Sequence, residues 1–170
     1  MQQNHVISIP KVAGYDTQRN SSTQTEISDE VITNNGFFPD VQLVNIRNAM
    51  RIDGTVTDER LKHSVISAMA TVNKDLKNYR EQAQSNNKNT LAECNDEQIN
   101  GLSLDVYNYL RAVYCLAVAN LYERYRSYDS TKEGHDKSAE LENTADDLKR
   151  DYHFAVRDIL GGNRMISELV

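Results

Sequence analysis

Tyrosine and arginine side chains gather in one stretch of the chain, where they could contact a nucleic acid or another protein. Six of the nine tyrosines lie within residues 107–128, interleaved with three arginines. Aromatic rings combined with arginine are one way to stack the bases of single-stranded nucleic acid. Several of these tyrosines fall off the apolar stripe of the expected helix, where a ring with a polar tip also suits a protein interface. The residues expected at a contact between subunits are Tyr107, Tyr109, Tyr122, Arg124 and Arg126.

Five carboxylates near the C-terminus are spaced at alternating intervals of four and seven residues. They are Asp136, Glu140, Asp147, Asp151 and Asp158. On a helix this spacing places them along one edge beside the apolar face, and we call this row the acidic edge. A solvated face is the ordinary interpretation of a charge run. The alternative is that the acidic edge faces basic residues of a neighbouring subunit or a lumen that several subunits enclose.

Residue types that catalyse reactions or bind metals occur without the spacing that such sites need. The four histidines are scattered, with neither an HExxH pattern nor a Cys–His group. Cys115 lies beside an apolar stripe and suits a small buried side chain better than a nucleophile. Asp146 and Asp147 point about 100° apart on a helix, which disfavours a general acid/base pair. The sequence therefore predicts no catalytic site, no cofactor and no metal.

Length, charge and hydropathy limit the class of protein. The chain has 170 residues, of which 39% are hydrophobic, and a formal net charge of −6. This length suits one domain with its own core. The negative charge argues against sequence-independent binding to nucleic acid, which needs Lys and Arg against phosphate. No apolar run approaches the roughly 20 residues that span a membrane. Two cysteines without motif spacing favour a reduced cytosol.

Apolar residues recur every three or four positions along most of the chain, and this periodicity predicts an all-α protein. We expect a short helix that Gly54 ends, a long helix from a Thr57 N-cap to about Gln84, and a central helix that Ser103 caps. A turn at 132–135 should precede the last helix, which Gly161-Gly162 ends. A loop with one helical turn is expected within 85–101. Three long helices and a short one predict an antiparallel helical bundle.

The two ends of the chain differ from this bundle, which we assign to residues 37–162. Residues 1–36 are polar and predict an extended N-terminal arm. Within it, Val6-Ile7-Ser8-Ile9-Pro10 alternates before a proline, which is typical of a short extended segment that could dock on a neighbour; a disordered terminus is the alternative. Residues 163–170 form a C-terminal tail with two apolar pairs, which is typical of a docking peptide.

The order and spacing of five short blocks resemble the GPL family, the head completion/stabilisation proteins of contractile-tailed temperate phages. The resemblance covers roughly residues 36–170. The blocks are Phe37-Phe38-Pro39-Asp40, then Met50-Arg51-Ile52 with Thr55-Val56 and Arg60-Leu61, then Asn78-Tyr79-Arg80-Glu81-Gln82, then Leu121-Tyr122-Glu123-Arg124-Tyr125-Arg126-Ser127-Tyr128-Asp129, and Arg164-Met165-Ile166-Ser167.

This resemblance implies a structural protein of the virion neck, made in the bacterial cytoplasm, and not an enzyme. Such proteins resemble the connector adaptors of tailed phages, which are small helical bundles that join the portal vertex after DNA packaging. They form a dodecameric ring that extends the DNA channel, helps to retain the genome and carries the next neck protein and the tail. DNA would pass through without sequence-specific contact, and an acidic wall would repel its phosphates.

The resemblance also implies that the C-terminal segment reaches the portal protein. The portal contacts expected here are Arg164, Met165, Ile166, Leu169 and Val170.

A second reading from another functional class is a helical nucleic-acid-binding packaging accessory protein, similar to a small terminase. Arg111, Arg124 and Arg126 would then act with the tyrosines. The net charge of −6 argues against this reading. A DNA-binding assay at several salt concentrations separates the two, because phosphate contacts weaken steeply as salt rises.

Overall fold

The computed structural model of this chain describes residues 30–52, 54–126 and 132–162, with side chains for 30–52, 54–124 and 144–162. These ranges are mostly helical, so the all-α class is confirmed in its coarse form. The helices are α1 (Leu43–Met50), α2 (Asp58–Asp75), α3 (Lys77–Ser85), the 3-10 turn η1 (Leu91–Glu93), α4 (Leu104–Arg126) and α5 (Lys132–Ile159). Two small antiparallel sheets, which the sequence did not predict, pair β1 (Val31–Ile32) with β2 (Val41–Gln42), and β3 (Gln98–Ile99) with β4 (Leu102–Ser103).

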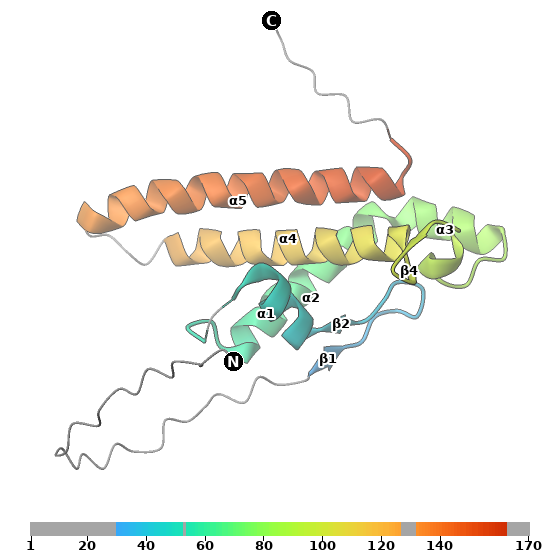
Figure 1. The fold of residues 1–170 in the computed structure, drawn as a ribbon, viewed down its shortest axis with the longest axis horizontal. Coiled ribbons are helices and arrows are strands. Elements are labelled where there is room, and N and C mark those ends of the chain that lie inside the picture. Colours follow the sequence, from blue (N-terminus) through green and yellow to red (C-terminus); the bar gives the residue numbers. More distant parts are fainter. Residues whose placement is uncertain (1–29, 53, 127–131, 163–170) are drawn as a thin grey trace, which may run out of the picture.

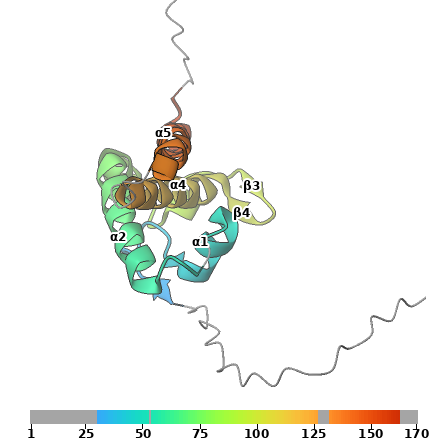
Figure 2. The ribbon, with the colours of Figure 1, turned by 90° about the vertical axis from the view of Figure 1, so that its left-hand side faces the viewer.

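Helix α4 lies at the centre of the fold. Helix α5 runs antiparallel along one side of it, and α1 and α2 lie on the other side (Figure 1 and Figure 2). Small residues on α4 allow this close approach, since Ala112, Ala117 and Ala119 are all fully buried. Helix α2 crosses α4 obliquely (Figure 1), so the antiparallel arrangement describes the α4–α5 hairpin rather than the whole set of helices.

The predicted long helix from Thr57 to Gln84 begins where expected but is not continuous. The Thr57 side chain accepts a hydrogen bond from the Arg60 N–H at 3.4 Å, which confirms the N-cap. The uninterrupted run to Gln84 was wrong, because Leu76 leaves the helical conformation at φ −91° and ψ 9° and separates α2 from α3. The Leu76 side chain is fully buried, so packing against the core holds the chain at this bend.

The boundaries of the last two helices also correct the sequence interpretation. The turn expected at 132–135 is part of α5, because residues such as Lys132 and Glu133 favour helix and offset the cost of Gly134. The connection to α4 falls to residues 127–131, outside the described residues. Ser103 lies in β4, and in the described part of the chain its buried hydroxyl has no hydrogen-bond partner, so it does not cap α4.

The expected end of α5 is confirmed. Gly161 has φ 69°, in the left-handed region that favours glycine, and the Gly162 N–H donates to the Arg157 carbonyl at 3.1 Å. The Gly161 N–H donates to the Asp158 carbonyl at 3.4 Å. This pair of bonds is the Schellman pattern, which satisfies the last carbonyls of a helix.

A closed triangle of hydrogen bonds fastens the segment before β2 to α2 and α4. The buried Tyr109 hydroxyl accepts from the Asn34 amide at 2.8 Å and donates to the Asn73 carbonyl oxygen at 2.7 Å. The Asn73 amide donates in turn to Asn34 at 2.9 Å. The Tyr109 ring stacks on Phe38 with centroids 4.9 Å apart. Burial raises the pKa of the Tyr109 hydroxyl, so it stays protonated and keeps its role as donor.

A buried ion pair joins α1 to the start of α2. The Arg47 side chain is 8% exposed, and its Nε donates to the Asp58 carboxylate at 3.0 Å. Its Nη2 donates to the Val56 carbonyl at 2.7 Å. The guanidinium thereby holds both the connection between the two helices and the first turn of α2.

Leucines that have the same helical spacing in the sequence differ in burial in the structure. Leu110 and Leu148 suit a core position by spacing, yet both are only partly buried, whereas Leu61 is fully buried. Leu61→Ala should lower the free energy of unfolding by about 2–5 kcal/mol, and Leu148→Ala by clearly less, because the lost contacts and the cavity are smaller. Chemical denaturation of both variants measures this difference. Equal losses would contradict the burial described here.

Removal of the Arg47 guanidinium should lower the free energy of unfolding far more than removal of an exposed guanidinium. Arg47→Met deprives the partly buried Asp58 of its cation, at a cost approaching the roughly 3–5 kcal/mol of a broken buried pair. Arg150→Met is the matched control, because Arg150 pairs with Asp147 at the surface and such pairs contribute about 0.2–1 kcal/mol. Thermal and urea melts of both variants test the contrast. Indistinguishable melts would show that the pair does not hold α1 in place.

Candidate functional site

Neither cysteine side chain is fully exposed, since Cys94 is partly buried and Cys115 is buried. Burial raises the pKa of both Cys94 and Cys115, which keeps these thiols protonated and weakly nucleophilic. Among the described residues, no group of three or more His, Cys, Asp or Glu is placed to hold a metal ion. No helix within the described ranges is long and apolar enough to cross a bilayer. The functional residues predicted from the sequence are expected to contact other proteins at the surface. In the structure they do not lie together.

The predicted subunit-interface set does not form one patch. Tyr109 is fully buried in the hydrogen-bonded triangle, so its assignment to an interface was wrong; α4 is covered on two sides and leaves less free surface than a single stripe suggests. Tyr107 is 53% exposed near the start of α4. Tyr122 is half-buried and Arg124 is exposed near its end, about 25 Å away at 1.5 Å per residue. The Arg126 side chain lies outside the described residues.

The acidic edge is divided by the packing of α5 on α4. The Asp151 and Asp158 carboxylates lie 3.4 Å and 3.9 Å from the Arg111 guanidinium on α4. They help to hold the helical hairpin together, although the Asp151 side chain is still 42% exposed. Asp147 is exposed and pairs with Arg150 at 2.8 Å. The side chains of Asp136 and Glu140 lie outside the described residues.

Arg111 is the residue whose role sequence reasoning missed. Two nitrogens of its guanidinium face two carboxylates of α5, and a second ion pair, Lys149 with Glu123, joins the same helices farther along. These contacts compensate the positive charge of Arg111 with carboxylates of the same chain. They weaken the interpretation in which Arg111 binds phosphate.

A buried carboxylate fixes the start of α4. Asp105 is 3% exposed and accepts hydrogen bonds from the Tyr79 hydroxyl at 2.8 Å and the Asn95 amide at 2.9 Å. These bonds tie α3 and the loop after η1 to α4. Burial, together with the bond to Asp105, raises the pKa of Tyr79, so its hydroxyl stays a donor.

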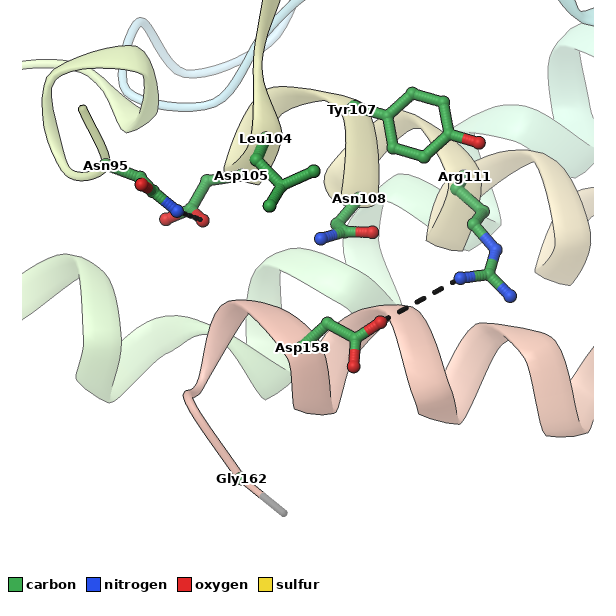
Figure 3. A pocket seen from close by; sticks show the side chains of 8 residues that line it. All are labelled: Asn95, Leu104, Asp105, Tyr107, Asn108, Arg111, Asp158 and Gly162. Carbon is green, nitrogen blue, oxygen red and sulfur yellow. Dashed lines mark hydrogen bonds and ion pairs between the residues drawn. The ribbon is translucent and has the colours of Figure 1, made fainter. Parts of the chain in front are cut away.

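An open hollow of about 460 Å³ lies between the start of α4 and the end of α5. Leu104, Asp105, Tyr107 and Asn108 line it from α4, and Asp158 lines it from α5 (Figure 3). Arg111 spans its mouth toward Asp158, and Gly162 forms part of the wall. This volume falls within the range of about 300–1,000 Å³ that is common for binding pockets.

Asn108 is the unusual member of this wall. It is only 5% exposed, and none of the described residues hydrogen-bonds its side-chain amide. Figure 3 shows the amide between α4 and α5, directed into the hollow. In the sequence, Asn108 is a polar residue between two positions that are buried, Val106 and Tyr109. That pattern could have indicated a functional residue, but helical periodicity does not say which side of α4 stays uncovered.

The β3–β4 hairpin projects at the same end of α4. Its two-residue turn, Asn100-Gly101, has positive φ at both positions, 53° and 75°, as a type I′ turn requires. Ile99 and Leu102 are paired across the strands and are 65% and 39% exposed. The hairpin runs directly into α4, so this end of the molecule presents apolar side chains next to the hollow.

Comparisons with known proteins agree over most of the chain. The family model described as "Phage head completion protein (GPL)" matches residues 32–170. The "Head completion/stabilization protein" of Escherichia phage P2 is 40% identical over 138 residues, which is 81% of this chain and 82% of that protein. The "Probable head completion/stabilization protein" of Haemophilus phage HP1 (strain HP1c1) is 28% identical over 108 residues, 64% of this chain and 71% of that protein. No solved structure matches.

The division of the acidic edge predicts different effects for two similar substitutions. Asp158→Lys places a cation against Arg111 and should lower the free energy of unfolding by about 1 kcal/mol or more, because an attraction becomes a like-charge contact. Asp147→Lys, at an exposed position of the same helix, should change it by less than about 0.5 kcal/mol. Thermal melts at low and high salt measure both, and the Asp158→Lys effect should shrink with salt. Equal effects of the two substitutions would indicate that Asp147 and Asp158 both belong to a solvated face of the helix.

Proposed function

Because this chain belongs to the phage head completion protein (GPL) family, we propose that it binds the portal vertex after DNA packaging and forms a ring there. The ring extends the DNA channel, closes the filled head against loss of DNA and carries the neck or tail completion protein. Twelve copies would match a dodecameric portal. The family relationship itself makes the chain a head completion/stabilisation protein, a structural component of the virion.

The observation that carries this proposal is the relation between the end of α5 and the family match. Gly161-Gly162 stops the helix with a complete cap, yet the match continues through residue 170. The tail beyond the cap has the composition of a docking peptide, with Met165, Ile166, Leu169 and Val170 as apolar residues. These residues lie outside the described part of the chain. With Arg164 opposite a portal carboxylate, they are the proposed portal contacts.

Charge supports a passive channel role. The net charge of −6 disfavours adhesion to DNA, so a ring of such subunits lets the genome slide past. Within the acidic edge, Asp147 stays available for the lumen or for a neighbouring subunit, as do Asp136 and Glu140 in this proposal. Asp151 and Asp158 are already paired with Arg111. Tyr107, Tyr122, Arg124 and Arg126 remain candidates for contacts between subunits.

Deletion of residues 163–170 tests the proposed anchor. The truncated protein should keep the helicity and melting temperature of the full chain, because the cap at Gly161-Gly162 is unaffected. It should fail to join portal-bearing heads, and those heads should lose DNA. Co-sedimentation with heads and a nuclease-protection assay measure the two outcomes.

Point variants sharpen the same test. Met165→Asp combined with Ile166→Asp should weaken attachment as the deletion does, because buried apolar contacts are replaced by charge. Glu168→Gln, in the same tail, is the matched control and should attach normally. If the truncated protein joins heads as tightly as the full chain, the anchor lies in the helical hairpin instead.

A further inference from the structure

We propose that the hollow between α4 and α5 receives an extended segment of the N-terminal arm, residues 6–10, from a second copy of this chain. The proposal starts from Asn108. As a whole residue Asn108 is only 5% exposed. Its side-chain amide offers two donors and an acceptor and makes no hydrogen bond to another described residue. The amide oxygen and nitrogen of Asn108 are not among the fully buried atoms that lack a hydrogen-bond partner. They therefore reach the open hollow, where a ligand that supplies both an acceptor and a donor can pair with them.

A peptide backbone supplies that pair of groups. The main chain of an extended segment presents one N–H and one C=O at each residue, and a side-chain amide such as that of Asn108 can pair with both. The wall beside Asn108 also has an apolar part, formed by Leu104 and the exposed ring of Tyr107. The hollow therefore suits a peptide with apolar side chains more than it suits a purely polar ligand.

Segment 6–10 has the matching pattern. In an extended chain alternate side chains share a face, so Ile7 and Ile9 would meet the apolar wall while the backbone around Ser8 pairs with Asn108. Charge agrees with this assignment, because Asp105 and Asp158 outnumber Arg111 in the wall. The first fifteen residues contain Lys11 but no Asp or Glu. The C-terminal tail fits the acidic wall less well, because the positive charge of Arg164 is balanced by the negative charge of Glu168.

A neighbouring copy is the favoured source of the arm. The arm enters the fold at β1, which lies on the opposite side of α4 from α5 (Figure 1), so the same chain would have to wrap around α4 to reach its own hollow. The nineteen residues between Pro10 and Glu30 span up to about 65 Å when extended, enough to reach an adjacent subunit. The inference rests on the proposed function for one point, that a ring brings copies side by side.

Photo-crosslinking of the full-length protein tests the contact directly. The variant Tyr107→p-benzoylphenylalanine places a photoreactive ring at the hollow, and Ile66→p-benzoylphenylalanine places it on α2 at a site of similar exposure that does not line the hollow. An equal mixture of ¹⁵N-labelled and unlabelled protein is irradiated at high concentration, digested and analysed by mass spectrometry. We expect crosslinks from position 107, and not from position 66, to the peptide that contains residues 6–10, in mixed-isotope pairs.

Variants of the arm and of the wall complete the experiment. Ile7→Asp combined with Ile9→Asp should reduce the crosslink about tenfold or more, because two apolar contacts are lost. Ile27→Asp, elsewhere in the arm, should leave it unchanged. Asn108→Ala should reduce it as well; if that variant does not fold, the arm variants still decide the question, because they leave the described fold untouched.

Three results would overturn the proposal. They are crosslinks only within one chain, crosslinks to residues 163–170 instead of the arm, and a crosslink that the Ile7 and Ile9 substitutions do not reduce. The crosslink measures contact between copies at high protein concentration, whereas the tail deletion measures attachment to heads, so the two failures are distinguishable. A protein whose arm binds the hollow but whose tail deletion still attaches to heads would retain this inference and lose the proposed portal anchor.

Discussion

Helix α4 is packed on two sides at once, and α1, α2, α5, η1 and β4 all contact it. Helix α5 covers one side, α1 and α2 cover the other, and the loop after η1 is tied to its first turn through Asp105. Its alanines allow the neighbouring backbones to come close, and Ser64 of α2 donates to the Ala117 carbonyl at 2.7 Å across that contact. A helix in this position has little free surface. Its polar residues must therefore be satisfied inside the protein or by a partner.

The polar residues near the start of α4 show both outcomes. Asp105 and Tyr109 are buried and fully engaged, the first by Tyr79 and Asn95, the second by Asn34 and Asn73. Asn108 lies between them in sequence and faces the hollow at the end of α5, beside Asp158 and the Gly161-Gly162 stop of that helix. The early stop of α5 thus produces both the hollow and the starting point of the tail. Two proposed contacts, one with the portal and one with a neighbouring copy, arise from this one helix end.

Local signals in the sequence predict local features well. The Thr57 cap, the glycine stop of α5 and the long helices α4 and α5 depend on residues close together in the chain, and the structure has them. The order of short blocks also indicated the family that the comparisons show. The bend at Leu76, the burial of Tyr109 and the pairing of Arg111 with Asp151 depend on residues far apart in sequence. The periodicity of one helix does not specify which other helix packs against it. For this reason the sequence did not predict that Tyr109 of the interface set is buried, or that Asp151 and Asp158 of the acidic edge pair with Arg111.

The cap at the end of α5 also has a mechanical meaning. A side chain at Gly162 would come within 2.8 Å of the Arg157 side chain, so the absence of one lets the backbone fold tightly against the helix end. Packed DNA pushes outward on whatever closes a head, and a tail fixed to the portal would transmit that load into α5 along its axis. The ion pairs of Lys149 with Glu123 and of Arg111 with Asp151, and the bond of Tyr152 to Asp75, cross from α5 to its neighbours. If the tail is fixed as proposed, a pull along α5 would load these contacts in shear and in parallel, so they would share the load.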